Sequence, residues 1–523
     1  MMDVPPRSTM EDLPLRWSPP DRRWFLAAAA LGIAGDALLR AGPGAGLALW
    51  LAALPLVGAG LARRHGRLGW GRATVVGLGV AAAATLAVRS APPLQLLAIG
   101  LVGLSVGWSL LERPWTSGLV ARLGALTVAG FSAVALAPVG AFAARRATES
   151  DWSRRSTVAA RGAVAAAPVL VLVAGLFVAG DPVFARYADR LLEAGLAEAL
   201  SHLALALLLA WIAGGLVHSI AAVRVEDPAL EPGPLGRFAA EAIVALLLVD
   251  LLFATFLGVQ ARALFGGRAF VEATAGMTYA EYARSGFFQL ALAAMVALPT
   301  VLAADWIVAP TSEHRRTFVG LAYGLAAGVV LVLASGAHRM WLYVDAYGLT
   351  EARLYASAFM VWLAIVAVWL AATIAGGRSE RFAAGSLVAG WVLFVAMVAL
   401  NPAGLVVRVN AERASAGEMP GFDVEYGASA LGIDAVPALV EAVQRLPAAE
   451  GCRVAAHVMD LRDRRLDGDP RSWTVARWLA GRAVSGHEAE LRAAAVGCRE
   501  ERPGEGPGTV HQGLRSVPRT RAG

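Results

Sequence analysis

The sequence predicts an all-α fold: a polytopic helical membrane bundle of about 11–13 spans, followed by a small soluble domain. Of the 523 residues, 57% are hydrophobic and only 16% are charged, whereas soluble domains carry about 25% charged residues. Mean hydropathy is +0.58. The apolar residues also occur in blocks of roughly 17 to 25 residues, the length at which a helix crosses about 30 Å of hydrocarbon. These features exclude a secreted enzyme, a nucleic-acid-binding domain and a disulfide-stapled miniprotein.

The apolar blocks give the expected order of elements. Residues 1–23 are polar and proline-rich, which predicts a disordered lead-in. The first block begins at Trp24 and a second follows at once, so we interpret it as a retained span and not as a cleaved signal. The transmembrane domain is expected over 24–404, with candidate spans near 24–40, 45–62, 73–90, 94–111, 119–143, 158–180, 199–223, 238–264, 286–304, 318–336, 355–375 and 384–404.

The basic residues predict a bacterial cytoplasmic membrane and no nucleic-acid partner. All 46 are arginine, which is typical of a GC-rich bacterial coding sequence, and the net charge is +6. Arginines at span ends hold loops in the cytoplasm and attract anionic headgroups. Twelve spans give only a weak arginine bias between the two sides. The bias improves if one span between Arg72 and Arg145 is miscounted, so we favour an odd count with the C-terminal tail outside the cytoplasm.

The tail is the one sizeable soluble part, expected as a small helical domain over 405–498 with a disordered end over 499–523. One helix is predicted near 434–446, with Asp434 as its N-cap and Pro437 in its first turn. Another is predicted near 473–496. Cys452 and Cys498 both lie here. They are either a disulfide of an exported domain or two separate cytosolic thiols.

Signatures of metal, cofactor or nucleophile chemistry are missing from the sequence. The eight histidines are scattered, and His202 and His218 are about 24 Å apart if they share a helix, too far for one metal ion. The sequence has no phosphate-binding glycine loop and no G-x-S-x-G elbow. We therefore expect no metal and no cofactor, and we incline against an enzyme.

Four carboxylates fall within or at the ends of predicted spans, and Asp36 lies near the end of the first span. Asp250 lies near the middle of the eighth block, Glu241 lies at its start, and Asp305 ends the ninth. An unpaired carboxylate in hydrocarbon costs several kcal/mol, so such a group is neutral, paired or beside water. Asp250 is thus a candidate proton or cation site, and the alternative is a hydrogen-bonded structural side chain facing the bundle interior.

A stripe of glycines at every fourth position, Gly320, Gly324 and Gly328, favours close helix packing in the tenth block. Denser polar patterns flank the late spans. Glu281 and Arg284, at i and i+3, can pair on a helix before the ninth span. Arg339, Tyr343 and Tyr347 repeat on one helical face, after which Gly348 is a predicted C-cap and Thr350 the N-cap of the eleventh span. Taken alone, these patterns also fit an aromatic belt with interfacial caps.

Three ordered motifs resemble the bacterial integral membrane proteins grouped as DUF4173, which are related to DUF4153. They are TYAEYARSGFFQL from Thr278, RMWLYVDAYGLTEARLY from Arg339, and NPAGLVVRVNAERA from Asn401 followed by DAVPAL from Asp434. The resemblance covers about 275–445 and implies no activity. It makes the residues at the pattern positions candidates for a shared polar site: Glu281, Arg284, Arg339, Asp345, Tyr347, Thr350, Arg353, Asn401, Asn410 and Arg413.

Three functions remain open at this point. The first is a transporter or permease with a polar cavity near the bilayer midplane, which base rates for bundles of this size favour slightly. The second is an envelope signalling or scaffold protein that holds a partner through its tail. The third is a membrane-embedded enzyme acting on a lipid-linked substrate at the interfacial motifs. The expected partners are the lipid bilayer and an unidentified protein or small molecule.

Overall fold

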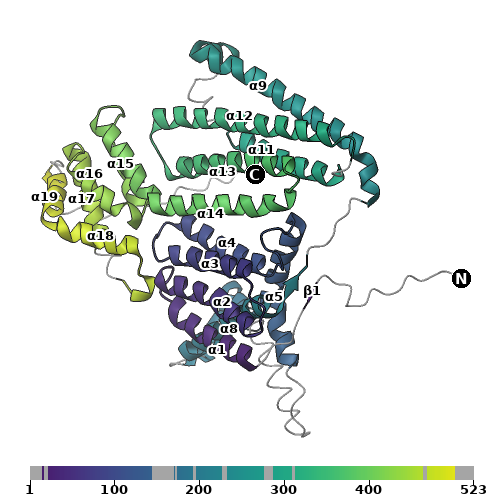
Figure 1. The fold of residues 1–523 in the computed structure, drawn as a ribbon. Coiled ribbons are helices and arrows are strands. Elements are labelled where there is room, and N and C mark those ends of the chain that lie inside the picture. The colour runs from purple at the N-terminus through teal and green to yellow at the C-terminus, as the bar shows by residue number, and fades with distance from the viewer. Residues whose placement is uncertain are drawn as a thin grey trace, which may run out of the picture.

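The computed structural model describes residues 15–16, 22–143, 170, 173–191, 196–226, 233–275, 287–308, 312–462 and 468–500. Within them the fold is almost entirely α-helical, which confirms the predicted class. Figure 1 shows two groups of long helices lying side by side, with a cluster of short helices at one end. Eight helices of the described part are long and apolar enough to cross a membrane.

The first group contains the early helices and α8. Its members are α1 (Arg22–Leu39), α2 (Ala45–Arg64), α3 (Trp70–Thr85), α4 (Pro92–Ser109), α5 (Leu119–Ala143) and α8 (Leu196–Ala222). The short helix α7 (Pro182–Leu191) precedes α8. Buried tryptophans fasten the group, because Trp24 donates from Nε1 to the carbonyl of Gly214 at 2.6 Å and Trp50 donates to that of Leu31 at 2.8 Å. Gly215 lies directly on the backbone of α5, where a Cβ would be 2.1 Å from the Ser132 oxygen.

The second group contains the late helices. Its members are α9 (Ala239–Ala275), α11 (Phe287–Ile307), α12 (Arg315–Tyr347), α13 (Glu351–Ala375) and α14 (Phe382–Leu400). Helix α12 packs against α9, α11 and α13, and α14 joins the group to α4. The short turns η3 (Gly233–Phe238) and η4 (Ser379–Arg381) precede α9 and α14.

The turns between helices gather at two opposite ends of the bundle. One end holds the two-residue strands β1 (Leu15–Arg16) and β2 (Arg224–Val225), which pair antiparallel. At this end the guanidinium of Arg72 donates to the carbonyls of Arg67, Ser109 and Ile220 and so joins the ends of α4 and α8 to the α2–α3 turn. The other end holds the α1–α2, α3–α4 and α12–α13 turns, and we call it the tail end.

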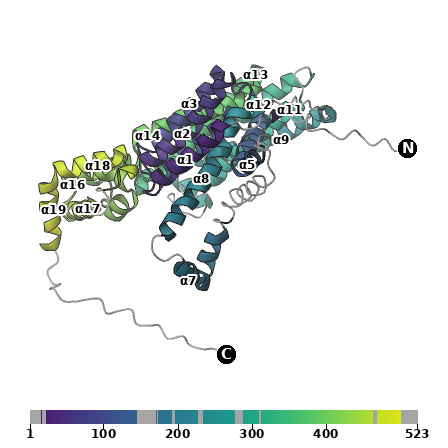
Figure 2. The same cartoon turned by 90° about the horizontal axis from the view of Figure 1, so that it is seen from below.

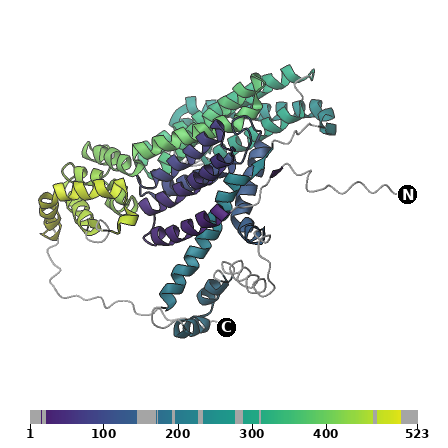
Figure 3. The same ribbon diagram turned by 60° about the horizontal axis from the view of Figure 1, so that its bottom comes forward.

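The tail domain continues from α14 without a linker. It comprises α15 (Pro402–Ser415), η5 (Glu425–Ala430), η6 (Ile433–Ala435), α16 (Val436–Val443), α17 (Ala448–Leu461), η8 (Pro470–Ser472), α18 (Val475–Gly486) and α19 (Glu488–Glu500). These helices surround an apolar core of their own. A disulfide joins Cys452 to Cys498, with Cα atoms 5.4 Å apart. The domain lies at the end of the bundle, as Figures 2 and 3 show from two further directions.

Two local predictions for the tail are wrong. Asp434 does not cap the helix after it, because it lies within the turn η6 and the N-cap of α16 is Ala435. The side chain of Asp434 instead accepts a hydrogen bond from another part of the chain. The helix predicted near 473–496 is two helices, which are separated at His487.

The predicted caps at Gly348 and Thr350 are confirmed, with φ of 78° at Gly348 and a Thr350 oxygen that accepts from the Arg353 N–H.

Candidate functional site at the junction of bundle and tail

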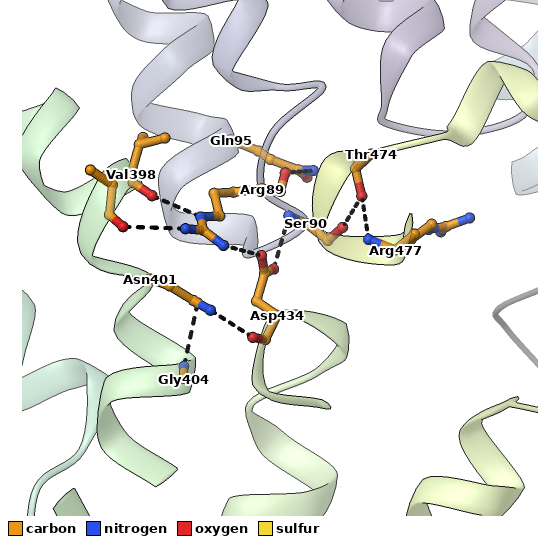
Figure 4. A network of polar contacts seen from close by, with 10 residues as sticks. Arg89, Ser90, Gln95, Val398, Asn401, Gly404, Asp434, Thr474 and Arg477 are labelled. Atoms are coloured by element: carbon orange, nitrogen blue, oxygen red, sulfur yellow. Dashed lines mark hydrogen bonds and ion pairs between the residues drawn. The ribbon is translucent and has the colours of Figure 1, made fainter. Parts of the chain in front are cut away.

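Asp434 is the centre of a polar network between the tail and the bundle. Its residue exposure is 3%. Oδ2 accepts from the backbone N–H of Ser90 at 2.8 Å, and Oδ1 lies 3.9 Å from Nη1 of Arg89. Figure 4 shows both groups pointing at the carboxylate from the α3–α4 turn. A buried carboxylate of the tail is thus bound by a turn between two helices of the membrane bundle.

Arg89 connects this carboxylate to a third element. Its Nε donates to the carbonyl of Val398 at 2.7 Å and its Nη2 to that of Ala399 at 3.4 Å. These carbonyls belong to the last turn of α14, where the helix has no further backbone donors and where a cation is electrostatically favoured. One guanidinium therefore joins the end of α14, the α3–α4 turn and the tail.

Asn401 shapes the chain where α14 gives way to α15. Its φ is 53°, the one positive value at a non-glycine residue in the described part of the chain. Asparagine tolerates this left-handed conformation better than most residues. Its Oδ1 accepts from the Gly404 N–H at 3.3 Å and caps α15, while its Nδ2 donates to the Asp434 carbonyl at 2.8 Å. The bend between the last span and the tail is thereby linked to the Asp434 turn.

Helix α18 is bound to the same α3–α4 turn through its first residues. The N–H groups of Val475 and Ala476 donate to the carbonyls of Ala87 and Val88 at 2.8 and 3.0 Å. The hydroxyls of Ser90 and Thr474 are 2.9 Å apart. The first N–H groups of a helix have no partner within it. The bundle therefore supplies the missing acceptors for α18.

A second carboxylate and two tyrosines lie beside Asp434. The backbone N–H of Glu351 donates to the Tyr426 hydroxyl at 2.9 Å. The negative charge of Asp434 acts on both Glu351 and Tyr355. Within the described residues, three buried oxygens here have no hydrogen-bond partner: Oε1 of Glu351, Oη of Tyr355 and Oδ1 of Asp434. The cluster therefore brings a second carboxyl group, with a buried oxygen that has no hydrogen-bond partner, close to Asp434.

Burial dominates the electrostatics of the ion pair. It raises the pKa of Asp434 to about 6, against the opposing effects of Arg89 and the Ser90 N–H. Burial also lowers the pKa of Arg89, although Asp434 opposes that shift. The Asp434 carboxyl can therefore change its charge near neutral pH while Arg89 stays protonated.

Several predicted site residues form a second cluster around the α12–α13 turn. Asn410 binds both backbone groups of Leu349, accepting from its N–H and donating to its carbonyl, each at 2.8 Å. Arg413 donates to the carbonyls of Val344 and Asp345 and lies 3.2 Å from the Asp345 carboxylate. These contacts fasten α15 to the end of α12.

Arg353 completes this second cluster. It donates to the carbonyls of Tyr347 and Gly348, and its guanidinium lies 4.0 Å from the centre of the Tyr343 ring. Tyr347 packs edge-on against Tyr343. Two of the three motifs thus come together. Arg339 lies buried within α12, and Glu281 and Arg284 fall outside the described residues.

The remaining predicted residues lie elsewhere in the bundle. Asp250 faces α12, because a Cβ on Gly324 would be 3.4 Å from its Oδ2. Gly328 packs against Phe253 of α9 in the same way, whereas Gly320 has open space around it. Glu241 is exposed, and Asp305 pairs with Arg315 at 2.7 Å near the end opposite the tail.

The sequence reasoning missed the partners of Asp434. Arg89, Ser90 and Thr474 carry no motif, and only their contacts reveal them. It also missed a pair between α1 and α8, where Nδ1 of His202 lies 2.5 Å from the Asp36 carboxylate, which also binds Arg40. Arg89 lies at the end of the block predicted over 73–90, as other arginines lie at helix ends, so no local signal distinguished it. The described residues contain no group of three or more His, Cys, Asp or Glu placed to hold a metal ion.

Comparison with known proteins adds one match. The family model described as domain of unknown function DUF4153 matches residues 74–442, which include Arg89, Asn401 and Asp434. No curated protein and no solved structure shows significant similarity to the chain. The match confirms the resemblance seen in the motifs and covers more than half of the chain. The protein therefore belongs to the DUF4153 family.

Proposed function

We propose that the protein is an envelope scaffold or signalling protein of a bacterial cytoplasmic membrane, with its tail domain held on the extracytoplasmic side to receive a partner. The observation that carries this proposal is the fixed attachment of the tail. Asp434 and Thr474 of the tail are both buried and bind Ser90 and Arg89 of the bundle, together with backbone hydrogen bonds from α18. A domain attached in this way presents its outer surface in a constant orientation to the membrane.

The distribution of arginines supports the proposed orientation. The turns and helix ends opposite the tail carry Arg63, Arg64, Arg67, Arg72, Arg113, Arg122, Arg224, Arg237, Arg315, Arg316, Arg378 and Arg381. The described turns at the tail end carry far fewer, Arg40 and Arg89, with Arg353 just inside α13. Short loops rich in arginine stay in the cytoplasm, whereas long domains are translocated largely regardless of charge. The five arginines between Arg145 and Arg161 lie outside the described residues.

The disulfide also supports an extracytoplasmic position of the tail. Cys452 and Cys498 are bonded and connect α17 to α19. Disulfides persist in oxidising compartments and are rare in the cytosol. A tail outside the cytoplasm accounts for both the disulfide and the arginine distribution.

Thiol labelling in intact cells tests this orientation. With a membrane-impermeant maleimide, we expect Cys452 and Cys498 to react only after reduction. A matched control carries serine at both positions and a cysteine in place of His65, which is exposed at the opposite end, and it should react only after permeabilisation. Labelling of the native pair only after permeabilisation would place the tail in the cytoplasm and overturn the proposal.

A transporter is the second candidate, because polar side chains line the interface of α9 with α12. Asp250 faces Gly324. Further along, the hydroxyl of Ser335 donates to Oε1 of Gln260 at 2.6 Å, with both residues buried. Proton flux into vesicles that contain the purified protein tests this function. The transporter requires the flux to fall strongly in Asp250→Asn and to persist in Glu241→Gln.

The enzyme alternative has less support. Among its described residues, Arg353, Asn410 and Arg413 are engaged with backbone groups of the α12–α13 turn. These hydrogen bonds hold the turn in place, and they leave the three side chains fewer donors for a substrate.

A further inference from the structure

A pocket of about 340 Å³ opens on the tail between η8 and one face of α18. Its walls include two indoles, Trp473 and Trp478, and two guanidiniums, Arg477 and Arg482. Both tryptophans are exposed, at 43% and 47%. The pocket adjoins the Asp434 junction, since the Arg477 N–H donates to the Thr474 hydroxyl at 3.1 Å, but the proposed function does not use the pocket itself.

The base of the pocket is hydrogen-bonded to the ends of two bundle helices, α1 and α2. The Trp473 carbonyl accepts from the N–H of Ala45, the first residue of α2, at 2.9 Å. Arg471 donates to the carbonyl of Ala37 in the last turns of α1 at 2.7 Å. Because α2 is one of the membrane-spanning candidates, the base of the pocket lies at the level where lipid headgroups begin.

The charge of the pocket is positive. Among the described residues, the one carboxylate in its wall belongs to Asp469 and is already engaged, since Nε of Arg471 donates to both of its oxygens at 2.9 Å. That contact lowers the pKa of Asp469 to about 2. In the described part of the chain, Arg477 binds Ser472 through Nη1 and Arg482 lies over the Trp478 ring, and neither is paired with a carboxylate. Two guanidiniums therefore remain for a ligand.

The pocket also has room between its aromatic and cationic walls. Gly481 lines it, and a Cβ at that position would meet no atom within 4 Å. The guanidinium of Arg482 lies 4.9 Å from the centre of the Trp478 ring. This contact holds the charge at the edge of an apolar surface.

We propose that this pocket binds the phosphate headgroup of an anionic phospholipid from the leaflet beside the tail. Guanidiniums match phosphate oxygens in a forked geometry. Indoles favour the glycerol level of the bilayer, between hydrocarbon and water. Inorganic phosphate would bind the two arginines but make no apolar contact with the two indoles, whereas a phospholipid can contact both. The site would tether the tail to the membrane, and it does not depend on which side the tail occupies.

Fluorine NMR of the full-length protein in detergent, with 5-fluorotryptophan incorporated, tests the proposal. Trp473→Phe and Trp478→Phe assign the two resonances. The probes are dihexanoyl phosphatidylglycerol, dihexanoyl phosphatidylcholine and inorganic phosphate. We expect phosphatidylglycerol to shift both resonances at concentrations about tenfold lower than either other probe, because each good ionic contact contributes about that factor.

Two variants with a matched control make the test specific. Gly481→Trp fills the pocket and should abolish the shift of both assigned resonances. Arg482→Gln should weaken binding about tenfold. Gly486→Trp is the control, because Gly486 also has open space but lies outside the pocket wall, and it should bind as the parent does. Equal responses to phosphatidylglycerol and phosphate would indicate a free-anion site, and no response, or a response that persists in Gly481→Trp, would equally overturn the proposal.

Discussion

The backbone N–H of Ser90 donates to the Asp434 carboxylate at 2.8 Å, across 344 positions of sequence. Ser90 lies in a turn between two helices of the bundle, and Asp434 lies in the tail domain. The contact is partly buried, and Arg89 and Asn401 extend it to the end of α14. The tail is therefore a fixed part of the molecule and not an appendage on a linker.

Removing the Asp434 carboxylate should loosen the tail. Asp434→Ala leaves the Ser90 N–H and the Arg89 guanidinium facing an empty site, and we expect a loss of about 2–4 kcal/mol in attachment. Asp434→Asn keeps an acceptor for Ser90 and is neutral like the protonated carboxyl, so at pH 4 it should cost less than about 1 kcal/mol. Pulse proteolysis of the tail in detergent measures both losses. Equal losses for the two variants would show that the acceptor for Ser90 contributes nothing.

Acidification should strengthen the attachment. Burial raises the pKa of Asp434 to about 6 in the folded state, against about 3.9 in an unfolded chain. A carboxyl whose pKa is raised by folding contributes stability that is fully present below the unfolded value and is lost as pH rises through the folded value. We expect about 2–3 kcal/mol to be lost between pH 4 and pH 7. Proteolysis of the tail against pH should show this step in the parent and not in Asp434→Asn, and an identical step in both would assign it to another group.

Leucine at Gly328 should disturb the contact between α12 and α9. A Cβ there would lie 3.4 Å from Phe253, so a branched side chain must displace that ring at a cost of about 1–3 kcal/mol. Leucine at Gly320, two turns earlier and open, should change stability by less than about 0.5 kcal/mol. Thermal unfolding in detergent compares the pair. A loss at Gly320 as large as that at Gly328 would contradict this packing.

Reduction should destabilise the tail domain. The disulfide closes a loop of 46 positions, for which chain entropy predicts about 3–4 kcal/mol of stabilisation. Unfolding of the tail with and without reductant measures this difference. The double variant Cys452→Ser, Cys498→Ser should match the reduced parent and ignore the reductant, and a parent that is also insensitive to reductant would leave the bond without a stabilising role.

Local signals in the sequence were sufficient for the helices and several of their ends. Apolar blocks of spanning length predicted the bundle, and Gly348 and Thr350 predicted the end of α12 and the start of α13. These features depend on neighbouring residues, so periodicity and capping chemistry reveal them. The break at His487 follows Ser485 and Gly486, a pair that marks turns, and the prediction missed that signal.

Long-range contacts account for the misinterpretation of Asp434. An aspartate before Val436 and Pro437 has the local pattern of an N-cap, but a distant N–H competes for its carboxylate and binds it. The family motifs pointed to Asn401, Asn410 and Arg413, and these do bind the turns beside the junction. They could not point to Arg89, because nothing in its neighbourhood distinguishes it from the other arginines at helix ends.

Hydrogen exchange at Val475 and Ala476 tests the attachment of the tail most directly. These amides open α18 and have no acceptor within their own helix, so only their bonds to Ala87 and Val88 can protect them. In the full-length protein we predict slow exchange at both amides in the parent and much faster exchange in Asp434→Ala, with the interior of α18 still protected. Exchange at solvent rates in the parent would contradict the account, because the tail would then be free of the bundle.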